Sequence, residues 1–568
     1  MNTSGKFSYA FRKSPLLRTF FAVIIIAIAV TGIFIFTIRT TPTPEIYSIT
    51  PPVGNPGDLV TIKGKNFGNE RDMNYVEFSG NRLTASSYVA WTDDTIKVII
   101  PANIQNGLVV VGNAKHRSSP SFFANENDIP VEVKATPKPV TPIITDLSVD
   151  SAAVGEAVTI KGSNFGEARG NSRVLWTVDY EGVLAQEEIP SLNLLTDHMI
   201  ACSESDYDYE SWTNDAITVR VPSGAFSGVV VVETARGMSE PFYIDVDTKI
   251  GTKELVNQKT YLVQYSADVS DIYVKSPATI TLRCPIPPVY EVQPSIENTE
   301  TRPEPTLANY HQTLIHQLNV DKNRVGKTSF SQTFVIPVYE VRTHVNAARV
   351  SQSYKSISKG LYERKIAATD SIPANNEQIV ELGKKIIGRE KNPYRQAKLV
   401  FDYMVREFKI DTRDRKAEAD PLELLHRERG DAYDFAVVYA SILRSLKIPC
   451  MVNSGFLASQ DMMAKTHFWN EFYVAGFGWV PVDTAMAAGL EFGKWADKPA
   501  DMGYYFGNQD NHRVTFSRDL NDIKPFAHDS NVVQRPRTFA MQNFWEESTS
   551  EVVSYSSYWS DPVVKGIY

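Results

Sequence analysis

Cysteine is scarce in this sequence. Its 568 residues include three cysteines, Cys202, Cys284 and Cys450, and no two of them form a CxxC pair. This spacing indicates neither a zinc site nor a disulfide framework, so we expect no metal and no cofactor. A single bridge between domains, Cys202–Cys284, stays open as an alternative.

A surplus of positive charge is also missing. Lys and Arg number 58 against 66 Asp and Glu, which gives a formal net charge of −8. The sequence therefore has no basic footprint, and we expect no nucleic-acid partner. The chain is too long for one hydrophobic core, and its length predicts roughly three to five domains.

One long apolar run is present near the N-terminus. Residues 20–38, FFAVIIIAIAVTGIFIFTI, carry no charge, and a helix of this length spans about 28 Å, close to the hydrocarbon thickness of a bilayer. Basic residues precede the run at Lys6, Arg12, Lys13 and Arg18, whereas Arg39 alone follows it closely. The positive-inside rule predicts a single-pass membrane protein, with residues 1–19 in the cytoplasm and the later domains extracytoplasmic. A cleaved signal peptide is the alternative, but the run is longer than a usual signal-peptide core.

An internal repeat follows the apolar run. VTIKGKNFG at 60–68 recurs as VTIKGSNFG at 158–166, 98 residues later, and WTDD at 91–94 recurs as WTND at 212–215, 121 residues later. Short β-branched runs between turn residues predict an antiparallel sandwich for each copy. The second copy holds about 23 extra residues around 179–210.

These repeated residues resemble IPT/TIG domains, which are immunoglobulin-like. The resemblance covers 45–133 and 142–247, and it implies spacers or interaction surfaces rather than chemistry. A proline-rich linker at 135–142 joins the copies. In the insert, Asp206, Asp208 and Glu210 lack the spacing of a calcium loop, so we expect solvated surface there.

The β pattern continues to about residue 370. Alternating runs such as 260–265 and 332–338 predict a further β-sandwich over 250–370, which we expect to support the next domain. Helical periodicity returns at 375, where Ala397, Val400, Met404 and Phe408 form one apolar stripe. Residues 508–568 are expected to form a C-terminal extension, as a cap or small β unit.

Three motifs between residues 430 and 483 carry the functional signal. GDAYDFA at 430–436 opens an apolar helix, whereas HFWNE at 467–471 and GWVPVD at 478–483 are typical of neighbouring strands. A hairpin between these strands brings His467 beside Asp483. A carboxylate that orients a histidine near a helix N-terminus is the arrangement of a thiol–imidazole–carboxylate triad.

At these residues the chain resembles the transglutaminase-like superfamily, whose core is papain-like. The family pattern is G-x-C-x-(D/E)-(Y/F)-A, H-x-W-x-E and W-x-x-x-D. Its positions are occupied here by Gly430, Ala432, Asp434, Phe435, Ala436, His467, Trp469, Glu471, Trp479 and Asp483. The resemblance covers 375–507 and implies catalytic positions at 432, 467 and 483. It also suggests Trp469, Trp479 and Asp434 as binding residues. The departure is decisive, because the nucleophilic cysteine of the pattern is Ala432 here.

No other side chain replaces the missing thiol. Ser441 lies nine residues further along the same helix, about 13 Å away along its axis. Cys450 begins an apolar strand and is expected to be a small core residue. His467 and Asp483 are therefore either a satisfied polar pair kept from an active fold or a pair used in ligand recognition. For Trp469 and Trp479, the alternative to binding is that they are core aromatics.

The sequence thus predicts a multidomain chain with tandem all-β Ig-like sandwiches, a further β domain and an α+β transglutaminase-like core. Its predicted function is that of a membrane-anchored, extracytoplasmic pseudoenzyme that binds a peptide or protein at the cell envelope. Two alternatives remain open. One is an active cysteine-type peptidase or acyl transferase in its Cys form, with Ala432 an engineered or variant residue. The other is a surface adhesin or scaffold.

Overall fold

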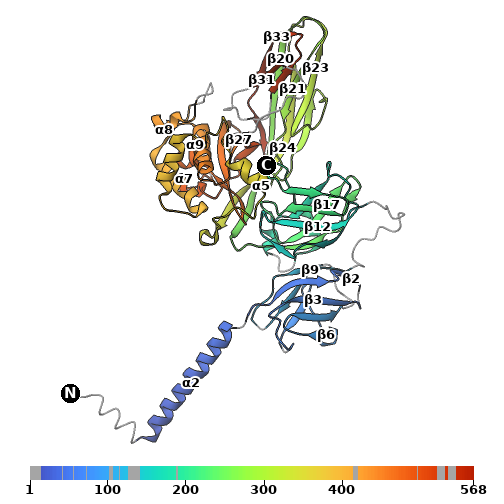
Figure 1. Ribbon diagram of the computed structural model, residues 1–568, viewed down its shortest axis with the longest axis vertical. Helices are drawn as coiled ribbons and strands as arrows, with labels where there is room; N and C mark the ends of the chain where they lie inside the picture. Colours follow the sequence, from blue (N-terminus) through green and yellow to red (C-terminus); the bar gives the residue numbers. More distant parts are fainter. Residues whose placement is uncertain are drawn as a thin grey trace, which may run out of the picture. The chain divides into compact units, whose positions relative to one another are not determined.

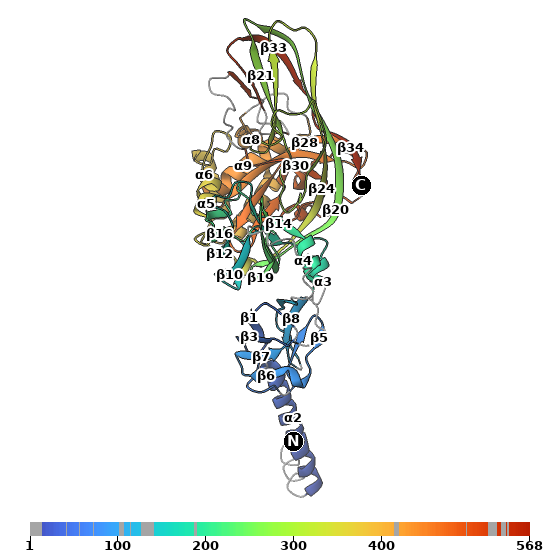
Figure 2. The ribbon, with the colours of Figure 1, turned by 90° about the vertical axis from the view of Figure 1, so that its right-hand side faces the viewer.

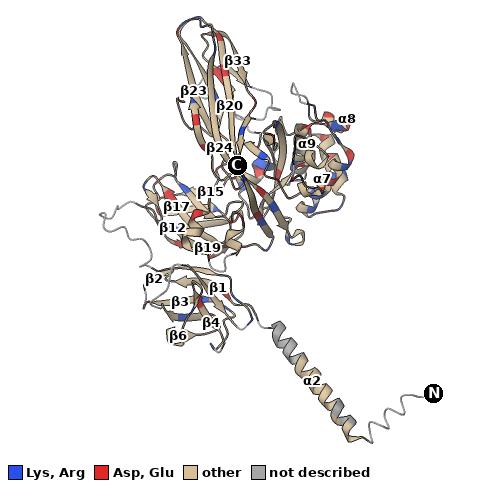
Figure 3. Ribbon diagram, turned by 180° about the vertical axis from the view of Figure 1, so that it is seen from behind, with Lys and Arg blue, Asp and Glu red and all other residues tan. Residues whose placement is uncertain are grey.

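The computed structural model describes residues 14–40, 42–55, 57–71, 73–100, 107–113, 115–125, 141–186, 190–413, 420–495, 497–520, 531–534, 541 and 545–568. Two compact units are present: residues 1–134 with 189–192, and residues 135–188 with 193–568. The described residues form eight sheets and several helices, so the predicted multidomain fold class is confirmed (Figure 1). Residues of both charge signs occur along the strands and helices (Figure 3).

The first unit begins with helix α2 (Pro15–Thr40), which contains the predicted membrane segment 20–38. Within the described part of the chain, no helix meets the combined length and hydropathy required to cross a bilayer. The membrane anchor therefore stays a prediction.

A sandwich of two sheets, whose strands pair mostly in antiparallel fashion, follows in the first unit. One sheet has the order β1–β3–β7–β6, and the other has the order β2–β9–β8–β4–β5. The strands are β1 (Glu45–Thr50), β2 (Val53–Gly54), β3 (Leu59–Lys65), β4 (Tyr75–Phe78), β5 (Asn81–Arg82), β6 (Tyr88–Trp91), β7 (Thr95–Ile99), β8 (Gly107–Gly112) and β9 (Ser121–Asn125).

The second repeat copy has the same arrangement at the start of the second unit. Its sheets are β10–β12–β16–β15 and β11–β19–β17–β13–β14, and β18 also pairs with β17. The strands are β10 (Ile143–Leu147), β11 (Ser151–Ala152), β12 (Ala157–Ser163), β13 (Arg173–Thr177), β14 (Met199–Ala201), β15 (Tyr209–Trp212), β16 (Ala216–Arg220), β17 (Gly228–Thr234), β18 (Gly237–Met238) and β19 (Phe242–Val246).

The repeated Asn-Phe-Gly has the same conformation in both copies. Gly68 and Gly166 have φ of 88° and 94°, which a glycine adopts without strain. Phe67 and Phe165 between them are buried in their own sandwich cores. The predicted turn with an inward phenylalanine is therefore present twice.

The insert of the second copy is not solvated surface throughout, so that prediction is wrong. It contains the short helices α3 (Val183–Gln186) and α4 (Leu192–Asp197). Asp206 and Asp208 are both buried, and an Asp206 carboxylate oxygen accepts from Arg518 Nη1 at 2.8 Å. The sequence alone could not predict this burial, because the arginine that pairs with Asp206 lies 312 residues away. The insert is a contact with the core domain.

A third sandwich is built around the long strands β20 (Gly251–Val274) and β24 (Thr328–Val345) (Figures 1 and 2). One sheet has the order β22–β24–β20–β33, with β34 also on β20, and the other has the order β23–β21–β32–β31. The remaining strands are β21 (Ala278–Pro285), β22 (Glu297–Arg302), β23 (Thr313–Val320), β31 (Asn531–Gln534), β32 (Trp545–Ser548), β33 (Val552–Trp559) and β34 (Val563–Ile567). Segment 508–568 thus supplies four strands to this sandwich and strand β30 (Arg513–Arg518) to the core sheet, rather than a separate extension.

The core domain places a buried helix against a four-stranded antiparallel sheet. The sheet order is β29 (Gly478–Val482), β28 (Ala464–Val474), β27 (Cys450–Ala458) and β30 (Arg513–Arg518). The helices are α5 (Lys359–Ile366), α6 (Glu377–Ile387), α7 (Pro393–Glu407), α8 (Glu423–Arg427), α9 (Ala432–Ser445) and α10 (Thr484–Ala487), and a two-stranded pair, β25 (Lys409–Ile410) and β26 (Arg429–Gly430), precedes α9. Every residue from Ala432 to Arg444 is buried, because α9 lies between the sheet and the other helices.

The helices that flank α9 begin where the sequence predicts. Asn392 caps α7 by accepting from Arg395 N at 3.1 Å, and Pro393 occupies the first turn, where a missing N–H is harmless. The predicted stripe of α7, from Ala397 to Phe408, is buried in the same apolar cluster as α9.

Candidate functional site

The site begins at the N-terminus of α9. Asp431 is the N-cap, and its carboxylate accepts from Asp434 N at 3.1 Å. In return, Asp434 Oδ2 accepts from Asp431 N at 3.2 Å, which completes a capping box. Ala432 is therefore the first helical residue, as predicted, and it is 7% exposed. The contacts of Asp434 are those of a helix cap; its predicted role in binding stays untested.

The hairpin of β28 and β29 brings the predicted histidine and carboxylate together. Its register pairs Asn470 with Val482, so Asp483 follows the end of β29. His467 Nε2 lies 2.6 Å from Asp483 Oδ2, and both side chains are buried. The second oxygen of Asp483 accepts from Met486 N at 2.8 Å, which caps the short helix α10. Asp483 thus orients the imidazole while its own position is held by a backbone N–H.

Arg513 is a further charged partner that the sequence reading missed. Arg513 Nη2 donates to Asp483 Oδ2 at 2.7 Å, and Nη1 lies 2.5 Å from Asp510 Oδ2. The sequence does show a charged residue, Arg513, at the start of the strand-like run 513–518. Nothing near it in the sequence identifies Asp483 as its partner. The site is therefore an imidazole, two carboxylates and a guanidinium, and His467, Asp483 and Arg513 are at most 3% exposed.

The charges in this array shift one another's pKa values. Burial would raise the pKa of Asp483, but the contacts with His467 and with the Arg513 guanidinium outweigh burial and hold that pKa well below its usual range. Burial would likewise lower the pKa of Arg513, whereas Asp510 and Asp483 raise it above its ordinary value. Asp483 is thus an anion and Arg513 a cation at neutral pH.

The first turn of α9 packs on the strand that carries His467. The rings of Tyr433 and Phe468, each next to a site residue, lie 5.1 Å apart, and Asn470 Nδ2 donates to Ala436 O at 2.9 Å. These contacts join the helix start to β28 as the triad arrangement requires. Position 432 belongs to this first turn, so any side chain there is attached to the part of α9 that packs on β28.

His467 keeps one nitrogen without a partner. Its Nε2 faces Asp483, whereas its buried Nδ1 has no hydrogen-bond partner within the described part of the chain. A carboxylate on Nε2 favours a proton there, which leaves Nδ1 as an acceptor. In a triad this second nitrogen serves the nucleophile, and here position 432 supplies none.

The two predicted binding tryptophans are both buried. The ring of Trp469 stacks on His467 at 5.9 Å between centroids and 14° between planes, so Trp469 packs beside the imidazole of the site. Trp479 packs edge-on against Tyr473 in an apolar cluster with α5, and its backbone N–H donates to Ser223 Oγ. These contacts of Trp479 are those of a core aromatic, and binding by either indole is untested.

None of the possible substitute nucleophiles occupies the missing position. The three cysteines are free and buried, so the alternative bridge Cys202–Cys284 is wrong. Cys450 is fully buried, and burial raises the pKa of its thiol, which keeps it protonated. Ser441 Oγ donates to Val437 O within α9 at 2.7 Å.

Comparisons with known proteins agree with the motifs. Residues 380–484 match the family model of the transglutaminase-like superfamily, and residues 44–124 match the IPT/TIG domain model. A curated relative, an uncharacterized protein of Haemophilus influenzae, is 26% identical over 195 residues, which are 29% of this chain and 51% of the relative. The chain thus spans about half the length of that relative. A cyclomaltodextrin glucanotransferase of Paenibacillus macerans is 36% identical over 85 residues, 15% of this chain and 12% of that enzyme.

Among solved structures, a candidate cysteine protease from Cytophaga hutchinsonii is 12% identical, with a TM-score of 0.34. That likeness covers 56% of this chain and 91% of the protease chain. The periplasmic domain of TgpA from Pseudomonas aeruginosa is also 12% identical, with a TM-score of 0.23, over 42% of this chain and 88% of the other. By its family matches, this chain contains an IPT/TIG domain, and its core domain is a transglutaminase-like domain.

Proposed function

We propose that the chain is a membrane-anchored, extracytoplasmic pseudoenzyme whose transglutaminase-like domain binds a peptide or protein at the cell envelope. The single observation that carries this proposal is the complete His467–Asp483 pair beside a helix that starts with Ala432. Acyl transfer and peptide hydrolysis by this fold need a thiolate at that helix start. A methyl group there cannot attack a carbonyl carbon.

The retained array supports a role in recognition. A buried charged group is expensive unless partners satisfy it, and Asp483 has three partners: His467, Arg513 and the backbone N–H of Met486. The remaining acceptor, His467 Nδ1, has no hydrogen-bond partner among the residues that the structure describes. A peptide N–H or a side-chain hydroxyl is the kind of donor that would satisfy this nitrogen.

The proposed location rests on the N-terminal sequence. The uncharged run 20–38 lies within the 26-residue helix α2, and most nearby basic residues precede it. The repeat sandwiches follow in sequence, and their described residues contain no group of His, Cys, Asp and Glu that could hold a metal ion. They are therefore proposed as spacers between the bilayer and the core domain.

The first prediction concerns restoration of the nucleophile. Ala432→Cys should react with iodoacetamide faster than an ordinary thiol at pH 7, because the helix N-terminus and His467 favour the thiolate and lower its pKa by about one unit or more. The measurement is the alkylation rate against pH, followed by mass spectrometry of the full chain. Incorporation of a dansyl-amine into a peptide substrate then reports acyl transfer.

Matched variants separate the possible outcomes. Ala440→Cys places a thiol deeper in the same helix and should stay slow, because residue 440 is fully buried. Ala432→Cys with His467→Gln should lose the rate enhancement. Turnover by the unmodified chain would refute the pseudoenzyme. An unreactive Ala432→Cys would instead favour a scaffold in which the core domain is only a fold.

A further inference from the structure

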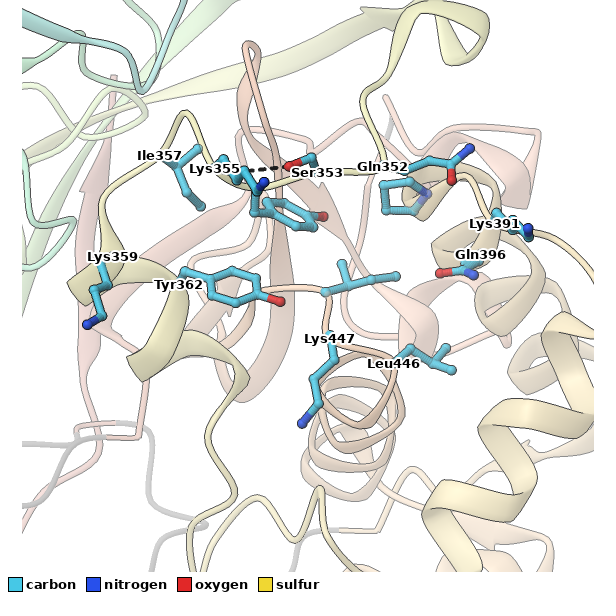
Figure 4. Close-up of a pocket in the computed structure, with 13 residues that line it drawn as sticks. Gln352, Ser353, Lys355, Ile357, Lys359, Tyr362, Lys391, Gln396, Leu446 and Lys447 are labelled. Atoms are coloured by element: carbon cyan, nitrogen blue, oxygen red, sulfur yellow. Dashed lines mark hydrogen bonds between the residues drawn. The ribbon is translucent and has the colours of Figure 1, made fainter.

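A cavity of about 720 Å³ lies at the other end of α9 (Figure 4). Its walls are the loop before α5, the starts of α5 and α7, and residues 446–448, which follow α9. The 14 residues of α9 separate it from Ala432 by about 20 Å along the helix axis. It is thus distinct from the His467 site, and its volume is that of a small-molecule pocket.

Positive charge gathers around this cavity. Its lining contains Lys355, Lys359, Lys391 and Lys447, and no Asp or Glu among the described residues. Lys359 Nζ lies 3.7 Å from Glu363, so its charge is partly compensated. The structure gives the other three lysines no carboxylate within 4.0 Å in the described ranges. Three lysines without a nearby carboxylate among the described residues therefore line this cavity, in a chain whose net charge is −8.

The cavity also has a rigid aromatic wall. The rings of Tyr354 and Tyr362 stack with centroids 5.4 Å apart and an interplanar angle of 29°. Tyr354 is fixed by its hydroxyl, which donates to Tyr473 O at 3.0 Å. In Figure 4 the ring of Tyr362 extends from α5 toward the middle of the cavity, and Gln396 lies opposite it on α7.

The N-terminus of α5 adds to the charge of the lysines, whereas at α7 the Glu390 carboxylate accepts from the backbone N–H groups of Lys391 and Asn392 and offsets the helix charge. The N-termini of α5 and α7, at Lys359 and Pro393, both line the cavity. Helix N-termini carry a partial positive charge. The C-terminal end of α9 has the opposite sign, but Lys447 follows it directly and offsets that end.

We propose that this cavity binds a small organic anion that carries several carboxylate or phosphate groups and presents one flat face to the two tyrosines. Lysine ammonium groups attract both kinds of anion, because they act as point charges without a geometric preference. The tyrosine pair supplies contact area at little cost in side-chain entropy. This site goes beyond the function proposed for the His467 array and does not depend on it.

The test uses the full chain, purified in detergent, and isothermal titration calorimetry with two probes. Benzene-1,3,5-tricarboxylate carries three carboxylates on a flat ring, whereas tripolyphosphate carries phosphates without a flat face. Each probe should bind saturably at one site, and its affinity should fall as the salt concentration rises. The triple variant Lys355→Gln, Lys391→Gln, Lys447→Gln should weaken binding by about tenfold or more.

A control variant makes the same change in net charge elsewhere. Lys384→Gln, Lys385→Gln, Lys565→Gln alters three exposed lysines outside the cavity and should change binding by less than about twofold. Tyr362→Ser should weaken the tricarboxylate but not tripolyphosphate. Circular dichroism checks that each variant is folded.

Three results would overturn the proposal. The first is the absence of saturable binding by both probes up to about 10 mM, where the affinity would be too weak for a specific site. The second is an equal loss of binding in the cavity and control variants, which would show a diffuse charge effect. The third is equal binding of the tricarboxylate with and without Tyr362, which would remove the flat-face requirement.

Discussion

Asp483 connects the imidazole, the guanidinium and a helix N-terminus through its two oxygens. Each contact favours the carboxylate over the carboxylic acid. For this reason its pKa in the folded protein lies below the value of about 3.9 expected in an unfolded chain. Protonation of Asp483 at low pH would therefore weaken the contacts that hold the geometry of the site.

A second prediction follows for acid stability. Because the folded pKa of Asp483 is lowered, its contribution to stability is complete above about pH 4 and is lost as pH falls toward the folded value. Asp483→Asn should lower the free energy of unfolding at pH 7 by about 3–5 kcal/mol, since Arg513 loses a buried partner. It should also flatten the decline in stability below pH 4. Urea unfolding at pH 7 and pH 3, followed by tryptophan fluorescence, measures both effects.

Asp519 provides the comparison for this measurement. Its carboxylate is buried between Lys365 Nζ at 2.9 Å and Arg444 Nη2 at 3.0 Å, and these two cations overcome burial to lower its pKa. Asp519→Asn should therefore flatten the decline in stability below pH 4 in a similar way, although the change leaves the contacts of His467 intact. If only Asp519→Asn changed the profile, Asp483 would not be the coupled group that its contacts indicate.

At this scale the sequence predicts the site only in part. His467 and Asp483 could be paired because sixteen residues and one glycine-rich turn define a hairpin between them. Arg513 could not, because it reaches Asp483 from β30, which follows long irregular segments in the sequence. A contact of that kind depends on the order of strands in the sheet, and no local pattern specifies it.

Among the elements, α9 has the most explicit start signal. Asp431 and Asp434 satisfy each other's backbone N–H groups, which a helix N-terminus otherwise leaves without partners. Their spacing in GDAYDFA is readable from sequence. The same spacing predicts that Ala432 is the first helical residue, as observed.

The third prediction concerns this cap. Asp431→Ala should lower the free energy of unfolding by about 1 kcal/mol, because Asp434 N loses its acceptor. Asp431→Ser should retain most of the stability, since serine is also a good N-cap. Urea titration of the two variants tests the difference. Equal stability of the alanine and serine variants would contradict a capping role.

Strand β20 shows where element prediction fails. The sequence indicates a short strand at 260–265, whereas the structure continues it over 24 residues. A register shift between Val256 and Lys259 lets the polar Asn257 and Gln258 pass without breaking the pairing with β24. A prediction from sequence ends a strand where polar residues interrupt its alternating pattern. Only the structure shows that a bulge lets the strand continue past them.

In the second compact unit, Arg518 joins the repeat insert to the core domain. Its guanidinium contacts Asp206 at 2.8 Å and Glu471 at 3.2 Å, and all three side chains are buried or nearly so. Tyr207 packs beside Gly360, where a Cβ would lie 2.6 Å from its ring. The second sandwich and the core domain are thus joined by ionic and close steric contacts.

The fourth prediction tests this connection. Asp206→Ala should lower stability by about 1–3 kcal/mol, since the buried Arg518 guanidinium would lose its 2.8 Å contact with a carboxylate. Hydrogen–deuterium exchange should rise in residues 203–210 and in β30. Asp197→Ala, an exposed change in the same insert, should leave exchange at its original rate. Unchanged exchange in Asp206→Ala would show that the ionic contact does not hold the insert.

The third sandwich has a consequence for synthesis of the chain. Its strands β20 to β24 precede the core domain, whereas β31 to β34 come after it, and β32, β33 and β34 pair directly with β21 and β20. During translation, β20 and β21 are therefore made long before these partners leave the ribosome. Until then their edges are open to wrong pairing, either with other strands of the chain or with other molecules. In sequence, the core domain is thus an insertion between strands that belong to one sandwich.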